Sequence, residues 1–281
     1  MKHNMGIMQG RLTMPKGRGI QFFPFDNWEN EFYTAQELHL DEIEFIFDYE
    51  EYEKNPLWTV EGIEKIRELS QKTGIKINAV CFDYFMRRPF YKFTKDLSDE
   101  VMRENTHILS KVLDGMKQLG ITLIEIPLVD NSSLQSDFEK EMFREWLIPI
   151  VRQHDWCKFG LETDLNPKGF VKYLESIDLP QVGANYDSGN SSGLGYDLYE
   201  EVTTLKDYIF NIHIKDRVFQ GTTVQLGTGS ADFDALFKGL KEIGYQHNFI
   251  LQAARGIEGE EKENISRQML FVKEKIEKYN I

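Results

Sequence analysis

The feature that most limits the fold of this chain is a repeated alternation of short apolar runs with stretches of helical periodicity. Such an alternation is typical of a parallel sheet covered by helices. Eight repeats favour an α/β fold with a closed (β/α)8 TIM barrel over an open, doubly wound sheet. The predicted strands are Met5–Gln9, Glu42–Phe47, Lys76–Phe82, Leu123–Val129, Phe159–Thr163, Gln181–Tyr186, Ile209–Ile214 and Asn248–Ala253.

The helical stretches begin and end at residues that commonly cap helices. Ser, Thr and Asn side chains accept hydrogen bonds from a first turn, and Gly adopts the left-handed conformation that ends many helices. The longest loop candidates are Arg11–Asp26 and Asp83–Asp99. The predicted helix signals are Thr59 to Gly74, Ser98 to Gly120, a capping box at Ser136 and Glu139, a start at Asn166–Pro167, an end at Gly244 and a final helix over Glu258–Tyr279.

Composition narrows the function classes. No Gly/Pro-rich linker divides the 281 residues, so we expect residues 1–281 to form one barrel domain. A formal charge of −13 argues against a nucleic-acid partner and against an anionic membrane surface. With no long apolar run, no signal-peptide pattern and only Cys81 and Cys157, we expect a cytosolic protein with reduced thiols.

Polar residues gather at the predicted ends of four adjacent strands. Glu162 ends the fifth strand, Asp187 follows the sixth, His213 lies near the end of the seventh and Gln252 lies near the end of the eighth. Active sites of (β/α)8 barrels are built at these ends. Carboxylate, imidazole and amide groups that converge there suit one divalent cation.

Each of these residues also has a purely structural interpretation. Glu162 could form a buried ion pair, Asp187 could cap the glycine-rich turn Ser188–Gly195, and His213 could be a hydrogen-bonded core imidazole. Their joint placement favours the metal site, because two buried carboxylates on adjacent strands repel each other unless a cation or proton lies between them.

Four motifs carry a resemblance to a known family. They are GIMQGRL near the start, NYDSGNS at the sixth strand, HIKDR at the seventh, and the segment LGTGSADFDALFKGLKEIGY that follows. Together they resemble the xylose isomerase-like TIM-barrel superfamily, in particular its sugar phosphate isomerase and epimerase branch, which includes the tagatose-type and the hexulose- and pentulose-phosphate 3-epimerases. The resemblance runs from Gly6 to Gln252.

The resemblance implies one divalent ion, such as manganese, magnesium, cobalt or zinc, held by Glu162, Asp187, His213 and the residue at position 252. It also implies a substrate contact for Arg217, in the HIKDR motif. In this chemistry the metal polarises the carbonyl of a ketose, and a carboxylate, here Glu162, removes the adjacent carbon-bound proton to give an enediolate. The implied ligand is a small sugar or sugar phosphate. The sequence leaves open whether the protein forms a homo-oligomer.

Gln252 departs from the family pattern, which has a second glutamate at this place. An amide oxygen can ligate a metal but cannot exchange a proton. The leading hypothesis is therefore a metal-dependent sugar isomerase or epimerase, and the alternative is a non-catalytic sugar-binding barrel. An endonuclease IV-like enzyme is disfavoured, because the additional histidines of its zinc cluster are missing.

Three further groups are candidates for binding substrate. Arg11 and Arg255 could hold a phosphate or a sugar oxygen, as could Arg217. The backbone of Gly227–Ser230, which leads into a helix, could bind an anion, although such glycine-rich turns are common in loops without a ligand.

Overall fold

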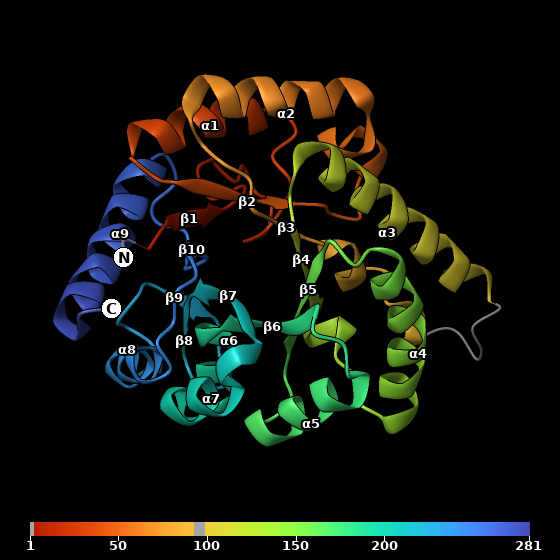
Figure 1. Ribbon diagram of the computed structural model, residues 1–281. Helices are drawn as coiled ribbons and strands as arrows, with labels where there is room; N and C mark the ends of the chain where they lie inside the picture. The colour runs from red at the N-terminus through yellow and green to blue at the C-terminus, as the bar shows by residue number, and fades with distance from the viewer. Residues whose placement is uncertain (1–2, 93–98) are drawn as a thin grey trace.

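The computed structural model, which describes residues 3–92 and 99–281, shows a closed barrel of parallel strands surrounded by helices (Figure 1). The strand order is β1-β10-β7-β6-β5-β4-β3-β2, so the last barrel strand closes against the first. This arrangement confirms the predicted (β/α)8 TIM barrel. The barrel strands are β1 (Met5–Met8), β2 (Glu42–Ile46), β3 (Ala79–Cys81), β4 (Leu123–Leu128), β5 (Lys158–Thr163), β6 (Val182–Asp187), β7 (Ile209–Ile214) and β10 (Phe249–Leu251).

Helices cover the outside of the barrel, and most of the apolar core lies between them and the strands. A second, smaller apolar cluster lies on four of the barrel strands and consists of Met8, Ile46, Cys81 and Ile250. The α-helices are α1 (Trp28–Glu37), α2 (Val60–Thr73), α3 (Glu100–Leu119), α4 (Asp137–Gln153), α5 (Pro167–Ile177), α6 (Ser188–Leu194), α7 (Leu198–Leu205), α8 (Phe233–Glu242) and α9 (Glu261–Tyr279).

Most of the predicted caps are confirmed. Thr59 caps α2, Ser136 and Glu139 form the capping box of α4, and Asn166 caps α5 ahead of Pro167. The predicted cap Ser98 lies outside the described residues, and Asp99 accepts the capping hydrogen bond of α3 instead. The proposed loop over Asp83–Asp99 contains two short 3-10 helices, η3 (Asp83–Met86) and η4 (Phe90–Lys92), and its residues 93–98 also lie outside the described part.

Two local differences from the sequence prediction shape the barrel mouth. The segment predicted as a glycine-rich turn, Ser188–Gly195, is the helix α6, because the Asp187 side chain caps its first N–H groups. A small antiparallel hairpin, β8 (Asp216–Arg217) with β9 (Thr223–Val224), follows β7 directly. In the described part of the chain, no helix combines the length and the apolar character needed to cross a bilayer.

Candidate active site

A cavity of about 540 Å³ opens at the carboxyl ends of the barrel strands. Its wall combines strand-end residues with residues of the loops that follow them, which is where (β/α)8 barrels carry their active sites. Among the lining residues are Glu125, Glu162, Asn190, Lys215, Arg217 and Gln252.

Three of the predicted metal ligands lie close together, and one of them, Glu162, lines this cavity. One ligand atom each from Glu162, Asp187 and His213 lies within 4.8 Å of the others, and all three residues are buried. His213 Nδ1 is 3.4 Å from Glu162 Oε2 and 3.9 Å from Asp187 Oδ2. The pairing of β6 with β7 places Asp187 directly opposite His213, after a shift in register at Ala184 and Asn185.

His213 is oriented by a residue that no sequence motif pointed to. Its Nε2 atom lies 2.8 Å from Glu44 Oε1, and Asn211 Nδ2 donates to the other oxygen of Glu44 at 2.7 Å. Glu44 comes from β2, on another side of the barrel, and is fully buried. A carboxylate that holds one imidazole nitrogen leaves the other nitrogen directed at the site, as is common for metal-binding histidines.

The charge of this cluster favours a protonated imidazole in the absence of a cation. Burial disfavours the charged ring, but the carboxylates of Glu44 and Glu162 outweigh it and raise the pKa of His213 well above its usual range. A divalent cation would supply the same positive charge. The residues present therefore fit one divalent ion, with carboxylate, imidazole and amide donors.

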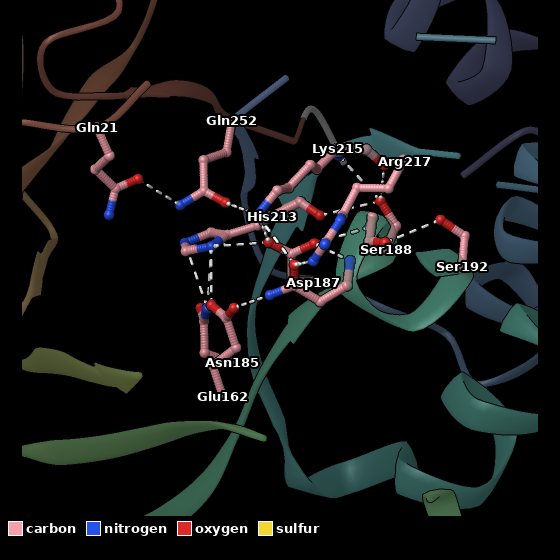
Figure 2. A network of polar contacts seen from close by, with 12 residues as sticks. Gln21, Glu162, Asn185, Asp187, Ser188, Ser192, His213, Lys215, Arg217 and Gln252 are labelled. Carbon is pink, nitrogen blue, oxygen red and sulfur yellow. Dashed lines mark hydrogen bonds and ion pairs between the residues drawn. The ribbon is translucent and has the colours of Figure 1, made fainter. Parts of the chain in front are cut away.

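Gln252 lies at the edge of this cluster, beside Lys215 rather than beside a carboxylate. Lys215 Nζ donates to Asp187 Oδ2 at 3.1 Å and to Gln252 Oε1 at 3.3 Å, while Gln252 Nε2 donates to Gln21 Oε1 at 3.1 Å (Figure 2). The stem of Lys215 packs so closely on Gly189 that a Cβ there would collide with it. Lys215 Nζ therefore contacts both Gln252 Oε1 and Asp187 Oδ2, so the amide oxygen shares a partner with one of the three clustered groups.

Two asparagines hold Glu162 in place and connect it to Arg217. Asn185 Nδ2 donates to Glu162 Oε2 at 3.2 Å, and Asn190 Nδ2 donates to Glu162 Oε1. Arg217 donates to Asn190 Oδ1 at 3.1 Å and to the carbonyl of Gly221, and it lines the cavity. The NYDSGNS segment therefore contributes more than its aspartate, because its asparagines position the candidate base.

The two other predicted substrate-binding arginines contact the backbone. Arg255 donates to the carbonyls of Gly10, Thr13 and Ile20 at 2.9–3.0 Å. Arg11 is buried and donates to the carbonyl of Ile20 and, at 3.5 Å, to that of Gln252. The described residues that line the cavity include Arg217 but neither Arg11 nor Arg255.

The glycine-rich turn after the hairpin binds an internal carboxylate. Asp216 is fully buried and accepts hydrogen bonds from the backbone N–H groups of Gly227, Gly229 and Ala231. A Cβ at Gly229 would collide with this carboxylate. The intervening N–H groups donate to backbone carbonyls. The turn therefore stabilises the loop, and its amides are not free for the anion that the sequence suggested.

Comparison with known proteins identifies the family. The family model described as "Xylose isomerase-like TIM barrel" matches residues 32–275. The chain belongs to this family. The predicted resemblance is therefore confirmed.

Several relatives with similar sequences or folds are sugar epimerases by name. The putative L-ribulose-5-phosphate 3-epimerase SgbU of Escherichia coli (strain K12) is 25% identical over 243 residues, which cover 80% of this chain and 83% of the relative. The L-ribulose-5-phosphate 3-epimerase UlaE of Salmonella heidelberg (strain SL476) is 23% identical, over 80% of this chain and 81% of the relative. The solved structure of an L-ribulose 3-epimerase superposes with a TM-score of 0.76 at 14% identity, covering 99% of this chain and 96% of that one, and shows the shared fold.

Proposed function

We propose that this chain is a metal-dependent isomerase or epimerase of a small sugar or sugar phosphate. The observation that carries this proposal is the convergence of Glu162, Asp187 and His213, with Glu162 lining the cavity and His213 held by Glu44. The names of the relatives support a ketose or ketose phosphate as the substrate class.

The proposed ligands of the divalent ion are Glu162, Asp187 through Oδ2, His213 through Nδ1, and the amide oxygen of Gln252. Manganese, magnesium, cobalt and zinc all suit this donor set. When bound, the ion supplies positive charge that polarises a carbonyl and stabilises an enediolate.

The residues of the chain itself account for the remaining steps. Glu162, fixed by Asn185 and Asn190, takes the proton from the carbon next to the carbonyl and returns it. Arg217 is positioned to bind a sugar or phosphate oxygen at the cavity. Substrate binding by Arg11 and Arg255 stays a prediction, since both donate to backbone carbonyls in the described structure.

The test is deuterium exchange followed by NMR. Metal-stripped protein, with and without added manganese, is incubated in deuterated water with L-ribulose, L-ribulose 5-phosphate and their aldose and 3-epimer partners. We expect metal-dependent incorporation of deuterium next to the carbonyl. Glu162→Gln should reduce this exchange roughly 10²- to 10⁴-fold while the thermal melt of the metal-free protein shifts by only a few degrees.

Other outcomes separate the alternatives. A sugar that stabilises the fold without any exchange would identify a binding protein that has no turnover. If calorimetry found no metal binding, or binding unaffected by His213→Ala, the metal site would be wrong. A collapse of folding in Glu162→Gln would instead assign Glu162 to a structural ion pair.

A further inference from the structure

A second buried glutamate, Glu125, lines the same cavity, and its carboxyl group has no hydrogen-bond partner among the described residues. Glu125 lies on β4, next to Cys81 of β3 and Gly160 of β5 in the strand register, and its side chain has no exposed surface. Neither of its carboxyl oxygens forms a hydrogen bond within the described residues. The neighbouring Cys81 thiol lowers the pKa of Glu125. A thiol is only a weak donor, however, and no hydrogen bond of regular geometry joins the thiol to the Glu125 carboxyl group.

Each of the other buried glutamates of the barrel has at least one hydrogen-bond partner among the described residues, although Glu42 Oε1 has none. Glu31 accepts from Gly10 and Thr13, Glu44 pairs with His213, Glu201 accepts from Tyr186, and Glu42 contacts Asn78. Buried polar groups are almost always hydrogen-bonded, because an unpaired one loses its hydration without compensation. An unpaired carboxyl that faces a cavity therefore indicates a group that a ligand contacts.

The position of Glu125 places it at the floor of the cavity. Pro127 of β4 pairs with Glu162, so Glu125 lies two residues below the level of the candidate base, where Gly160 contributes no side chain. The basic residues Arg87, Lys215 and Arg217 also line the cavity; Arg87 is exposed and the other two are half-buried. The Lys215 ammonium is already paired with Asp187. Burial, followed by the nearby Glu162 carboxylate, raises the pKa of Glu125 well above its usual range.

These surroundings favour one orientation of a sugar phosphate in the cavity. The negative charge of Glu162 disfavours a phosphate next to it, whereas the arginines that line the cavity match the charge of a phosphate. A hydroxyl group can both donate to and accept from a carboxyl, so a hydroxylated end of a sugar matches the floor.

We propose that Glu125 is a specificity-determining residue of this site, whose carboxyl group hydrogen-bonds a hydroxyl at the unphosphorylated end of the sugar. The proposal rests on the proposed function only in taking a sugar as the ligand, and it does not require turnover. The sugar enters with its hydroxylated end toward Glu125 and keeps any phosphate at the rim, near Arg217.

The experiment measures binding of two matched ligands. Titration calorimetry with manganese present compares L-ribulose 5-phosphate with its 1-deoxy derivative, which lacks the hydroxyl at the end opposite the phosphate. The wild type should bind the deoxy compound roughly 10²-fold more weakly, because the floor carboxyl would stay unpaired. Glu125→Leu should reduce this difference to within about threefold, and Glu125→Gln, which keeps an oxygen and adds N–H donors, should retain part of it.

Stability supplies a second readout, which needs no sugar. Removing an unpaired buried carboxyl at similar volume should raise the melting temperature of the ligand-free protein, by roughly 2–6 °C for Glu125→Leu. Glu42→Gln is the matched control, since Glu42 is a buried glutamate at the opposite end of the barrel and bonds to Asn78. It should leave the discrimination between the two sugars unchanged.

The outcomes distinguish this proposal from the proposed function. If the wild type distinguishes the two sugars through Glu125 but catalyses no deuterium exchange, the role of Glu125 is supported and the proposed catalysis is overturned. If the protein turns over substrate and Glu125→Leu distinguishes the two sugars as well as the wild type does, the role of Glu125 is overturned and the catalytic assignment stands. A large loss of stability in Glu125→Leu has the same consequence. If neither sugar binds to the wild type, both are overturned.

Discussion

Two walls of the barrel mouth carry buried charged side chains, and they use them differently. On the β5–β7 wall, Glu162, Asp187 and His213 are directed at one another beside the cavity. On the side of the β1 and β10 loops, the half-buried Arg255 is directed at backbone carbonyls, and Glu31 of α1 accepts from Gly10 and Thr13. The first wall therefore presents carboxylate and imidazole atoms near the cavity. On the second wall the charged side chains hold the loop after β1 against the barrel.

This difference shows that charge and burial alone do not identify a functional residue. Backbone groups need fixed partners, so a side chain that satisfies them is already used by the fold. Atoms that are balanced only by other side chains, such as Glu162 Oε2 and Asp187 Oδ2, can exchange those partners for a ligand. Asp187 serves both purposes, since its Oδ1 atom caps α6. Substitutions on the two walls should therefore change different measured quantities.

The largest effect on stability is expected from Arg255→Met. This change removes three hydrogen bonds, to the carbonyls of Gly10, Thr13 and Ile20. Gly10 and Ile20 each keep one other donor, from the Thr13 N–H and from Arg11. We expect the free energy of unfolding to fall by about 2–4 kcal/mol. Urea unfolding measures it, with Arg217→Met as the cavity-side control, which should lose about 1 kcal/mol and most of the sugar affinity. An Arg255→Met protein of normal stability that no longer binds sugar would instead support the predicted substrate contact.

The second expected effect is a pH dependence of stability from Glu31. Burial raises the pKa of Glu31 from 4.5 to about 7. Between these values the unfolded chain has released the proton and the folded chain still holds it, so stability falls as pH rises through this window. The loss amounts to at most about 3 kcal/mol.

Glu31→Gln should remove the part of the pH dependence that comes from Glu31, while Glu42, Asp83 and Glu201, whose pKa values burial also raises to about 7, keep theirs. Free energies of unfolding measured at pH 4.5 and pH 8 should show the variant gaining on the wild type as pH rises. Glu29→Gln, an exposed position on the same first turn of α1, is the control and should keep the wild-type slope. A stability difference between Glu31→Gln and the wild type that is the same at pH 4.5 and pH 8 would contradict the assignment.

The sequence predicted well those features that depend on neighbouring residues. Alternating strands and helices, the caps at Thr59 and Ser136, and polar residues at strand ends are all local patterns, and a parallel barrel brings its strand ends together by construction. That is why Glu162, Asp187 and His213 could be selected from the sequence alone.

The features that were missed depend on contacts across the barrel. Glu44 and His213 are 169 positions apart in the chain, and the only local sign was the Glu42–Glu44 spacing, which places two glutamates on one face of a strand. The roles of Lys215 and Arg255 also depend on packing between distant segments. Asp216 stands within the HIKDR motif, but no local pattern showed that the glycine-rich turn wraps around its carboxylate.

A smaller effect is expected from Glu44→Gln, which acts on the metal through His213. An amide cannot replace the carboxylate that fixes the imidazole, so we expect metal affinity to fall roughly 10- to 100-fold. Calorimetry with manganese measures it. Glu201→Gln, a buried glutamate bonded to Tyr186, is the control and should leave metal affinity unchanged. Unchanged affinity in Glu44→Gln would assign Glu44 to the core alone.

The smallest expected change in metal affinity comes from Gln252→Glu, at the residue that follows β10 beside the β5–β7 wall. A carboxylate at this position adds one negative charge to the proposed ligand set, so metal binding should tighten, by about tenfold. Part of this gain is offset, because Lys215 Nζ lies 3.3 Å from Gln252 Oε1 and would pair with the new carboxylate. Lys215→Met in the same background should therefore increase the gain.

The same variant also bears on the reaction, because neutral Gln252 cannot exchange a proton and only Glu162 is proposed to act on the carbon. With a base on one face, the parent protein should move a proton between neighbouring carbons on that face, which gives aldose–ketose isomerisation without inversion. Gln252→Glu should create or raise epimerisation, as measured by NMR in deuterated water on ketoses and their phosphates. Efficient inversion by the parent would mean that another residue or a water molecule supplies the second proton, and Gln252 would then not be the missing base.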